Sequence, residues 1–207
     1  AYYEWYNNSV LFISGTTEVE NGILSRISVV LSGNTTKDEK WECAVRMSDG
    51  IDIEVSWELE EIIIANTPPF TSHMVLNSTT GNNLPSEDLY CWGEGQDDDV
   101  IDTKLTAYYR WYKENNLEFE GNVPVDKGEL GLITILGAGN TSVDEEWKCS
   151  LLMSDGDDNE SEWNELSIVI GNTEPSTVEI VVRSSSRNNY SADNIECLSR
   201  GIDWEQG

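Results

Sequence analysis

Short runs of alternating apolar and polar residues recur along this chain, and clusters of Gly, Asn, Asp and Pro separate them. One such run places Trp147, Cys149, Leu151 and Met153 on one face, with polar or charged residues at 146, 148 and 150. Alternation with a period of two is typical of short antiparallel strands that bury one face. No segment keeps the 3.6-residue period of an amphipathic helix. The pattern therefore predicts an all-β fold.

The pattern repeats once, at a constant offset. AYYEWY at 1–6 returns as AYYRWY at 107–112, which gives an offset of 106 (107 minus 1). WEC at 41–43 and MSDG at 47–50 return at the same offset, as WKC at 147–149 and MSDG at 153–156. A period of this length indicates tandem domains, because the units of solenoids are much shorter.

The landmarks of the second copy come in a specific order. A strand with an inward Cys91 precedes an aromatic strand with Trp111, and the strand with Cys149 follows. This order resembles the immunoglobulin fold, in which a disulfide joins strands B and F and packs on a Trp of strand C. The whole chain is similar to the Ig-like tandem modules of microbial, especially archaeal, surface proteins. The resemblance implies a Cys91–Cys149 disulfide. It also implies core positions for four tryptophans, Trp5, Trp41, Trp111 and Trp147.

The resemblance also implies two β-sandwich modules, of which only one is complete. Residues 67–172 are expected to form the complete module. Its strands A, B, C, E, F and G are expected near 73–78, 88–93, 105–113, 130–136, 146–153 and 162–170. Residues 1–66 are expected to form an incomplete module that runs from strand C to strand G, without A and B. Residues 173–207 then hold a left-over A–B pair, near 177–184 and 193–199.

Both incomplete parts would expose what a sandwich normally buries. A sheet that lacks its neighbours has open edges and a bare apolar face, and a lone hairpin is scarcely stable in water. Both defects disappear if the A–B pair of one subunit enters the incomplete module of the next, as in β-strand addition. Because donor and acceptor are different surfaces, such a contact propagates into a filament. The partners expected on this basis are identical subunits joined head to tail.

The cysteines lead to the same expectation. Four cysteines allow three pairings. Once the resemblance assigns Cys91 to Cys149, Cys43 and Cys197 remain, and we expect them at opposite ends of one chain. A disulfide requires Cα atoms within about 7 Å, so we expect this pair to form between two chains. Disulfides also point to an oxidising, extracellular compartment.

Two other arrangements fit the same repeat phase. The chain can be a segment of a longer tandem array, in which chain continuity supplies strands A and B, or a monomer whose tail folds back onto its head. The break falls in the expected B–C loop, and exposed loops are where proteases cut. The chain also begins at Ala1 with no signal sequence, so we expect a processed or excised product.

The composition changes this picture mainly through charge. The 39 Asp and Glu residues outnumber the 12 Lys and Arg residues, and the formal net charge is −27. Such a field repels nucleic acid and anionic membrane surfaces, so we expect no nucleic-acid partner. No apolar run is longer than four residues, the length of the run at 62–65, which is far short of the roughly 18 residues that a membrane span needs. Hydrophobic residues make up 38% of the chain, which is enough to build packed cores.

Two kinds of surface site are candidates. Asn-x-Ser/Thr sequons, which accept N-linked glycans in secreted proteins, occur at six positions. They are Asn7, Asn34, Asn77, Asn140, Asn159 and Asn189. Clustered carboxylates suit calcium, although their spacing here matches no EF-hand loop and solvated turns are the alternative. The candidate calcium ligands are Asp97, Asp98, Asp99, Asp155, Asp157 and Asp158.

Nothing in the sequence indicates catalysis. His73 is the only histidine, and the chain has no nucleophile motif, phosphate loop or CxxC pair. We therefore expect a non-enzymatic, cofactor-free structural subunit of an extracellular filament, polymerised by strand donation and an inter-subunit disulfide. The alternative is an adhesin or surface-layer stalk segment of a longer Ig-like repeat protein, acting as a binding module.

Overall fold

The computed structural model describes residues 1–203 and consists of antiparallel strands with two short 3-10 turns. The strands are β1 (Tyr2–Asn7), β2 (Val10–Thr16), β3 (Lys40–Arg46), β4 (Glu58–Ile63), β5 (Phe70–Ser78), β6 (Leu89–Gln96), β7 (Lys104–Lys113), β8 (Asn116–Asp126), β9 (Gly131–Leu136), β10 (Glu146–Ser154), β11 (Asn164–Val169), β12 (Ser176–Ser184) and β13 (Ile195–Ile202). The all-β prediction is confirmed. Among residues 1–203 no helix is long and apolar enough to cross a membrane.

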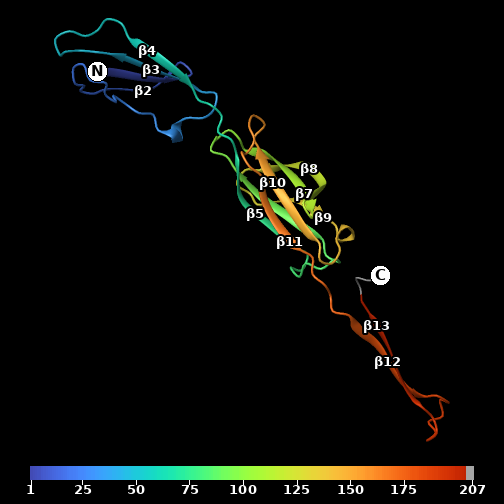
Figure 1. Cartoon of the computed structure of the whole chain (residues 1–207). Helices are drawn as coiled ribbons and strands as arrows, with labels where there is room; N and C mark the ends of the chain where they lie inside the picture. The colour runs from blue at the N-terminus through green and yellow to red at the C-terminus, as the bar shows by residue number, and fades with distance from the viewer. Residues whose placement is uncertain (204–207) are drawn as a thin grey trace.

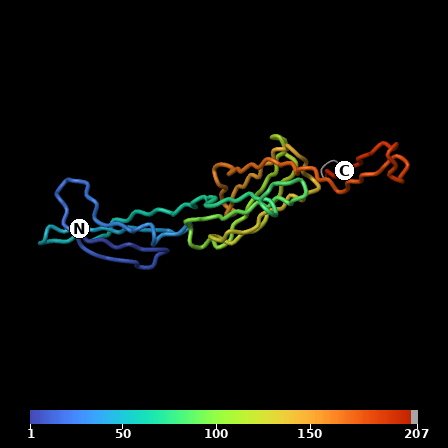
Figure 2. The backbone as a smooth tube through the Cα atoms, turned by 90° about the horizontal axis from the view of Figure 1, so that it is seen from below, coloured from blue at the N-terminus to red at the C-terminus, as the bar shows by residue number. Residues whose placement is uncertain are grey.

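Three bodies follow one another along an elongated molecule (Figure 1). We call them the head (1–66), the middle module (67–172) and the tail (173–207), of which 204–207 lie outside the described residues. The view from below shows the head and the tail at opposite ends as well (Figure 2). In this structure the tail therefore does not fold back onto its own head.

The middle module is built from two sheets that face each other. One sheet has the order β5-β6-β9 and the other the order β11-β10-β7-β8. The Cys91–Cys149 disulfide links β6 to β10 across the two sheets. Apolar residues from both sheets surround this bridge, and Trp111, Trp147, Leu151 and Met153 are almost fully buried there. Each Å² of apolar surface buried in this way stabilises the fold by about 25 cal/mol.

The head has only one of the two sheets. Its order, β2-β1-β3-β4, is that of β8-β7-β10-β11 moved by the repeat offset. Residues 25–30 are equivalent to β9 but form no strand. The reason is that β9 pairs with β6, and the head has no strand in the position of β6.

The tail is a two-stranded ribbon equivalent to β5 and β6. β12 pairs with β13 alone. The register shift between Thr71 and His73 in the β5–β6 pair recurs between Thr177 and Glu179 in the β12–β13 pair. The tail therefore reproduces the local geometry of the β5–β6 pair of the middle module, without a sheet to pack on.

The strands β2 and β8 were not predicted from the sequence. β8 and its equivalent β2 form hairpins with β7 and β1. The hairpin turns have positive φ at both central residues, Asn8 and Ser9 in one copy and Glu114 and Asn115 in the other. This is the type I′ geometry that two-residue hairpins prefer. The two sheets that contain these hairpins are therefore four strands wide.

The disulfide should add to the stability that the buried core gives the middle module. Replacing Cys149 with Ala removes a cross-link over a 58-residue separation, and we expect the free energy of unfolding to fall by about 2 to 4 kcal/mol. Chemical denaturation followed by tryptophan fluorescence measures this change. The matched control is Cys43→Ala, which removes a free thiol of the head and should leave the middle module unchanged. An unaltered unfolding midpoint for Cys149→Ala would contradict the role of the bridge.

Candidate assembly site

The head has a groove where the middle module has the sheet β5-β6-β9. The groove has a volume of about 1180 Å³ and is lined by residues 19–25, Ile27 and parts of β3 and the loop after it. Four apolar residues of the lining are Val19, Ile27, Val45 and Met47. Their equivalents in the middle module, at the 106-residue offset, are buried core residues: Val125, Ile133, Leu151 and Met153. The groove is therefore lined by residues whose equivalents are buried in the core of the middle module, but no second sheet covers them in the head.

Core residues of the middle module are more buried than their equivalents in the head, which lacks the covering sheet. Met153 is completely buried, whereas Met47 is 47% exposed. Ile170 and Cys149 are likewise buried, whereas Ile64 and Cys43 are only half-buried. Trp41 is an exception, because the rings of Trp5 and Phe12 pack edge-on against it and cover it.

The tail shows the complementary defect. In β5 and β6 the residues Met74, Leu76 and Leu89 pack on the core of the middle module. Their equivalents in the tail are Ile180, Val182 and Ile195, and all three are exposed, Ile195 to 81%. An apolar strand face of this kind on a two-stranded ribbon is a surface for association.

An unpaired polar atom in the head points to the same missing sheet. In the middle module, the Trp111 Nε1–H donates to Thr134 Oγ1 of β9 at 3.3 Å. The equivalent Trp5 Nε1 is buried and has no hydrogen-bond partner among the described residues. Ser28 stands at the position of Thr134 and has the required hydroxyl, but its segment forms no strand. A buried, unpaired donor is costly, so formation of that strand would stabilise the head.

Two free thiols lie on these two surfaces. Cys43 lies on β3 of the head and Cys197 on β13 of the tail, at the positions of Cys149 and Cys91. Burial raises the pKa of the Cys43 thiol. Cys197 is exposed, so its thiol is accessible to a partner.

A polar junction fixes the head to the middle module. The Lys37 side chain is only 7% exposed, and its Nζ lies 2.9 Å from Asp102 Oδ2 and 2.7 Å from Asp157 Oδ2. Asn66 Nδ2 donates to Asp155 Oδ2 and Asp158 Oδ2, and the Thr67 backbone N–H donates to Asp99 Oδ2. These contacts use five acidic residues of the middle module to hold the head and the segment that follows it.

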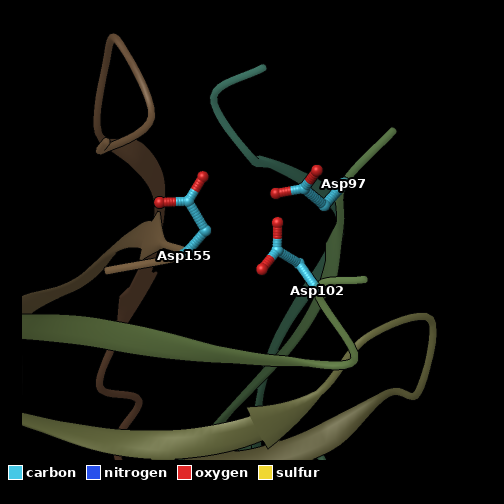
Figure 3. A group of neighbouring side chains, drawn as sticks. All are labelled: Asp97, Asp102 and Asp155. Atoms are coloured by element: carbon cyan, nitrogen blue, oxygen red, sulfur yellow. The ribbon is translucent and has the colours of Figure 1, made fainter. Parts of the chain in front are cut away.

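The calcium candidates fall around this junction. Asp97, Asp102 and Asp155 bring carboxylate oxygens within 4.8 Å of one another, and the three side chains point together (Figure 3). Asp102 was not among the sequence candidates, because it lies apart from the runs of acids. Asp98 is exposed and Asp157 pairs with Lys37, so the structure brings only Asp97 and Asp155 of the original set into this group.

The acids of this group have opposite pKa shifts. Burial raises the pKa of Asp97, and the neighbouring charges of Asp102, Asp99 and Asp155 add to the effect. Burial acts in the same direction on Asp155 but is outweighed by hydrogen bonds from the Asp158 N–H, Asn66 and the Asp157 N–H and by the charge of Lys37, so the pKa of Asp155 lies below its usual range.

Five of the six sequon asparagines are exposed: Asn34, Asn77, Asn140, Asn159 and Asn189. Asn7 is half-buried, and its Nδ2 donates to Glu39 Oε1 at 2.8 Å. His73 is exposed on β5.

Comparisons with protein-family models, with curated proteins and with solved structures find no match to this chain. The interpretation of the site therefore rests on its geometry and on the internal repeat.

The opposite shifts of Asp97 and Asp155 give a matched pair of variants. A carboxylate with a raised folded pKa destabilises the fold above its unfolded pKa of about 3.9, so Asp97→Asn should stabilise the middle module at pH 7. A lowered folded pKa means that the ionised form contributes stability above about pH 4, so Asp155→Asn should destabilise it. We expect changes of about 1 kcal/mol in each direction. Both should shrink as the pH falls below these pKa values, and thermal unfolding at pH 7 and pH 3 measures them. Changes of equal sign at pH 7 would contradict the assignment.

Proposed function

We propose that the chain is the structural subunit of an extracellular filament. The tail of each subunit completes the head of the next by supplying the missing sheet strands, as in donor-strand complementation. Cys197 of the tail then forms a disulfide with Cys43 of the neighbouring head. The completed unit has the strand set of the Ig-like middle module. The following observations support this proposal.

The observation on which the proposal depends is that the head and the tail have complementary side-chain sizes where the donated strand would pack. In the middle module, β6 has Gly93 directly against Leu151, and a Cβ added there would lie 2.7 Å from Leu151 Cδ1. The tail has Ser199 at the position of Gly93, which adds a side chain. The head has Val45 at the position of Leu151, and valine lacks the δ-carbons that would collide. The larger residue of the tail therefore matches the smaller residue of the head.

The strand register of the middle module gives the expected pairing. β6 pairs with β9 so that Cys91 lies opposite Thr134 and Leu89 opposite Leu136. Moved by the offset, Cys197 would lie opposite Ser28 of the neighbouring head, and Ile195 opposite Val30. Residues 25–30 would then become a strand, and Ser28 would lie where Thr134 accepts the hydrogen bond of Trp111. The buried Trp5 Nε1 would gain its partner in this way.

The same exchange favours identical partners over the alternatives. In a longer array, chain continuity would match the tail to residues that follow 207, and Ser199 would have no reason to fit Val45. A fold-back monomer is at odds with the separation of head and tail in both views (Figures 1 and 2). The Cys91–Cys149 disulfide supports an extracellular location, because disulfides persist in oxidising compartments.

Assembly should respond to the size match in a double-mutant cycle. Val45→Leu restores the δ-carbons that collide with Ser199 of the neighbour, and we expect it to weaken assembly by about 1 to 3 kcal/mol. Val45→Leu combined with Ser199→Gly reproduces the Leu–Gly pair of the middle module and should recover assembly. Sedimentation and electron microscopy of oxidised protein measure filament yield.

Deletion of 176–207 tests the proposal as a whole, since a subunit without a donor should not polymerise. Filaments formed by the deleted chain would contradict the proposal. If Val45→Leu reduced assembly and Ser199→Gly failed to restore it, the register of the donated strand would be wrong.

Glycans form a second test of the extracellular setting. Asn34 and Asn140 occupy equivalent exposed positions, each at the end of a short 3-10 turn, so we expect both to carry N-linked glycans in native material. Peptide mass mapping measures occupancy, and Asn66, whose sequence lacks the sequon, is the internal control. Unmodified masses at all six sequons would contradict this expectation.

A further inference from the structure

The loop at 47–57 of the head exposes apolar side chains that its counterpart lacks. Ile51 is 89% exposed and Val55 is 98% exposed. The equivalent residues in the 153–163 loop of the middle module are Asp157 and Ser161. A pair of nearly bare aliphatic side chains on one loop is a candidate interaction surface.

The two loops have the same backbone construction. In the head, Asp49 Oδ1 accepts the Ile51 and Asp52 N–H groups, as Asp155 Oδ1 accepts those of Asp157 and Asp158. Both loops also share a glycine of positive φ, Gly50 and Gly156. Ile51 therefore occupies in the head the place that Asp157 occupies in the middle module.

Asp157 is a contact residue between successive modules, because it pairs with Lys37 of the head. The loop that carries Lys37 also has an equivalent. Thr36 N–H donates to Glu39 Oε2, as Ser142 N–H donates to Glu145 Oε2. In the same way, Asp38 N–H donates to Ile64 O and Asp144 N–H donates to Ile170 O. The residue at the position of Lys37 in this second loop is Val143.

Both partners of the ion pair are thus replaced by apolar residues at the equivalent positions. Lys37 with Asp157 joins head and middle module inside one chain, and Val143 with Ile51 stands at the ends that meet if one subunit follows another. We infer that Val143 of one subunit packs on Ile51 of the next, as a second contact beside the donated strands. The partner is a second copy of this chain, and the inference rests on the proposed filament.

Other residues at the two ends agree with this contact. Pro85 and Ala138 lie at the same end of the middle module as Val143, since Thr141 Oγ1 donates to the carbonyl oxygens of both. Their repeat equivalents are polar, Ser191 and Ser32. Asn172 keeps the position of Asn66, and Asp49 and Asp52 keep those of Asp155 and Asp158. The junction between subunits would therefore retain the amide–carboxylate contact and exchange the ion pair for an apolar one.

Charge substitutions at the two positions test the contact in the full-length chain. Val143→Lys should raise the lowest concentration at which filaments form by about tenfold, because it places an unpaired charge against Ile51. Ile51→Asp should act in the same direction, and the double variant should recover most of the loss by recreating the Lys37–Asp157 pair. Leu132→Lys is the matched control, since Leu132 is 40% exposed on β9 and the head already has Arg26 at that position.

Three outcomes distinguish the Val143–Ile51 contact from the proposed filament. Recovery in the double variant supports the contact. Unchanged assembly in both single variants, or no recovery in the double variant, overturns it, and the proposed filament stands if deletion of 176–207 still abolishes assembly. Filaments formed without residues 176–207 would overturn the proposed filament itself, and the contact with it.

Discussion

A sheet with one apolar face is stable in water only when another layer covers that face. The middle module meets this requirement with two sheets joined by Cys91–Cys149, and its core residues are almost fully buried. The head and the tail each provide one part of the same construction. Their exposed apolar residues, the half-buried Cys43 and the unpaired Trp5 Nε1 all follow from the absence of the covering strands.

The proposed filament would contain two kinds of module junction. Inside a chain the junction is ionic, with Lys37 between Asp102 and Asp157. Between chains it would be apolar, with Val143 against Ile51. Asp157 is 63% exposed, so salt should weaken its pairing with the buried Lys37 in part, whereas salt does not weaken an apolar contact. The two junctions would therefore respond differently to ionic strength. The two junctions would also disfavour incorrect contacts during assembly. Lys37 against Ile51, or Val143 against Asp157, would place a charge against an apolar residue, which is unfavourable.

The sequence predicted the all-β class and most strands, because period-two alternation and the repeat mark them directly. It did not predict β2 and β8, since their turns, Asn8-Ser9 and Glu114-Asn115, lack the glycine that usually signals a two-residue hairpin. The predicted strand set of the head, C to G, includes a strand E, whereas residues 25–30, at the position of β9, form no strand because the head lacks the partner that β6 provides for β9. The meeting of Asp97, Asp102 and Asp155 depends on tertiary packing within the middle module, and the burial of Lys37 depends on packing between the head and that module. Neither leaves a local pattern in the sequence.

In the proposed filament the tail of one chain bonds to the head of another. Equal amounts of unlabelled and 15N-labelled protein, mixed while reduced and denatured and then refolded and oxidised together, test it directly. Proteolysis and mass spectrometry identify the peptide pair that contains Cys43 and Cys197. A bond between chains predicts disulfide-linked pairs in which one peptide is labelled and the other is not. Linked pairs that are only fully labelled or fully unlabelled, or the two cysteines recovered as free thiols, would contradict it.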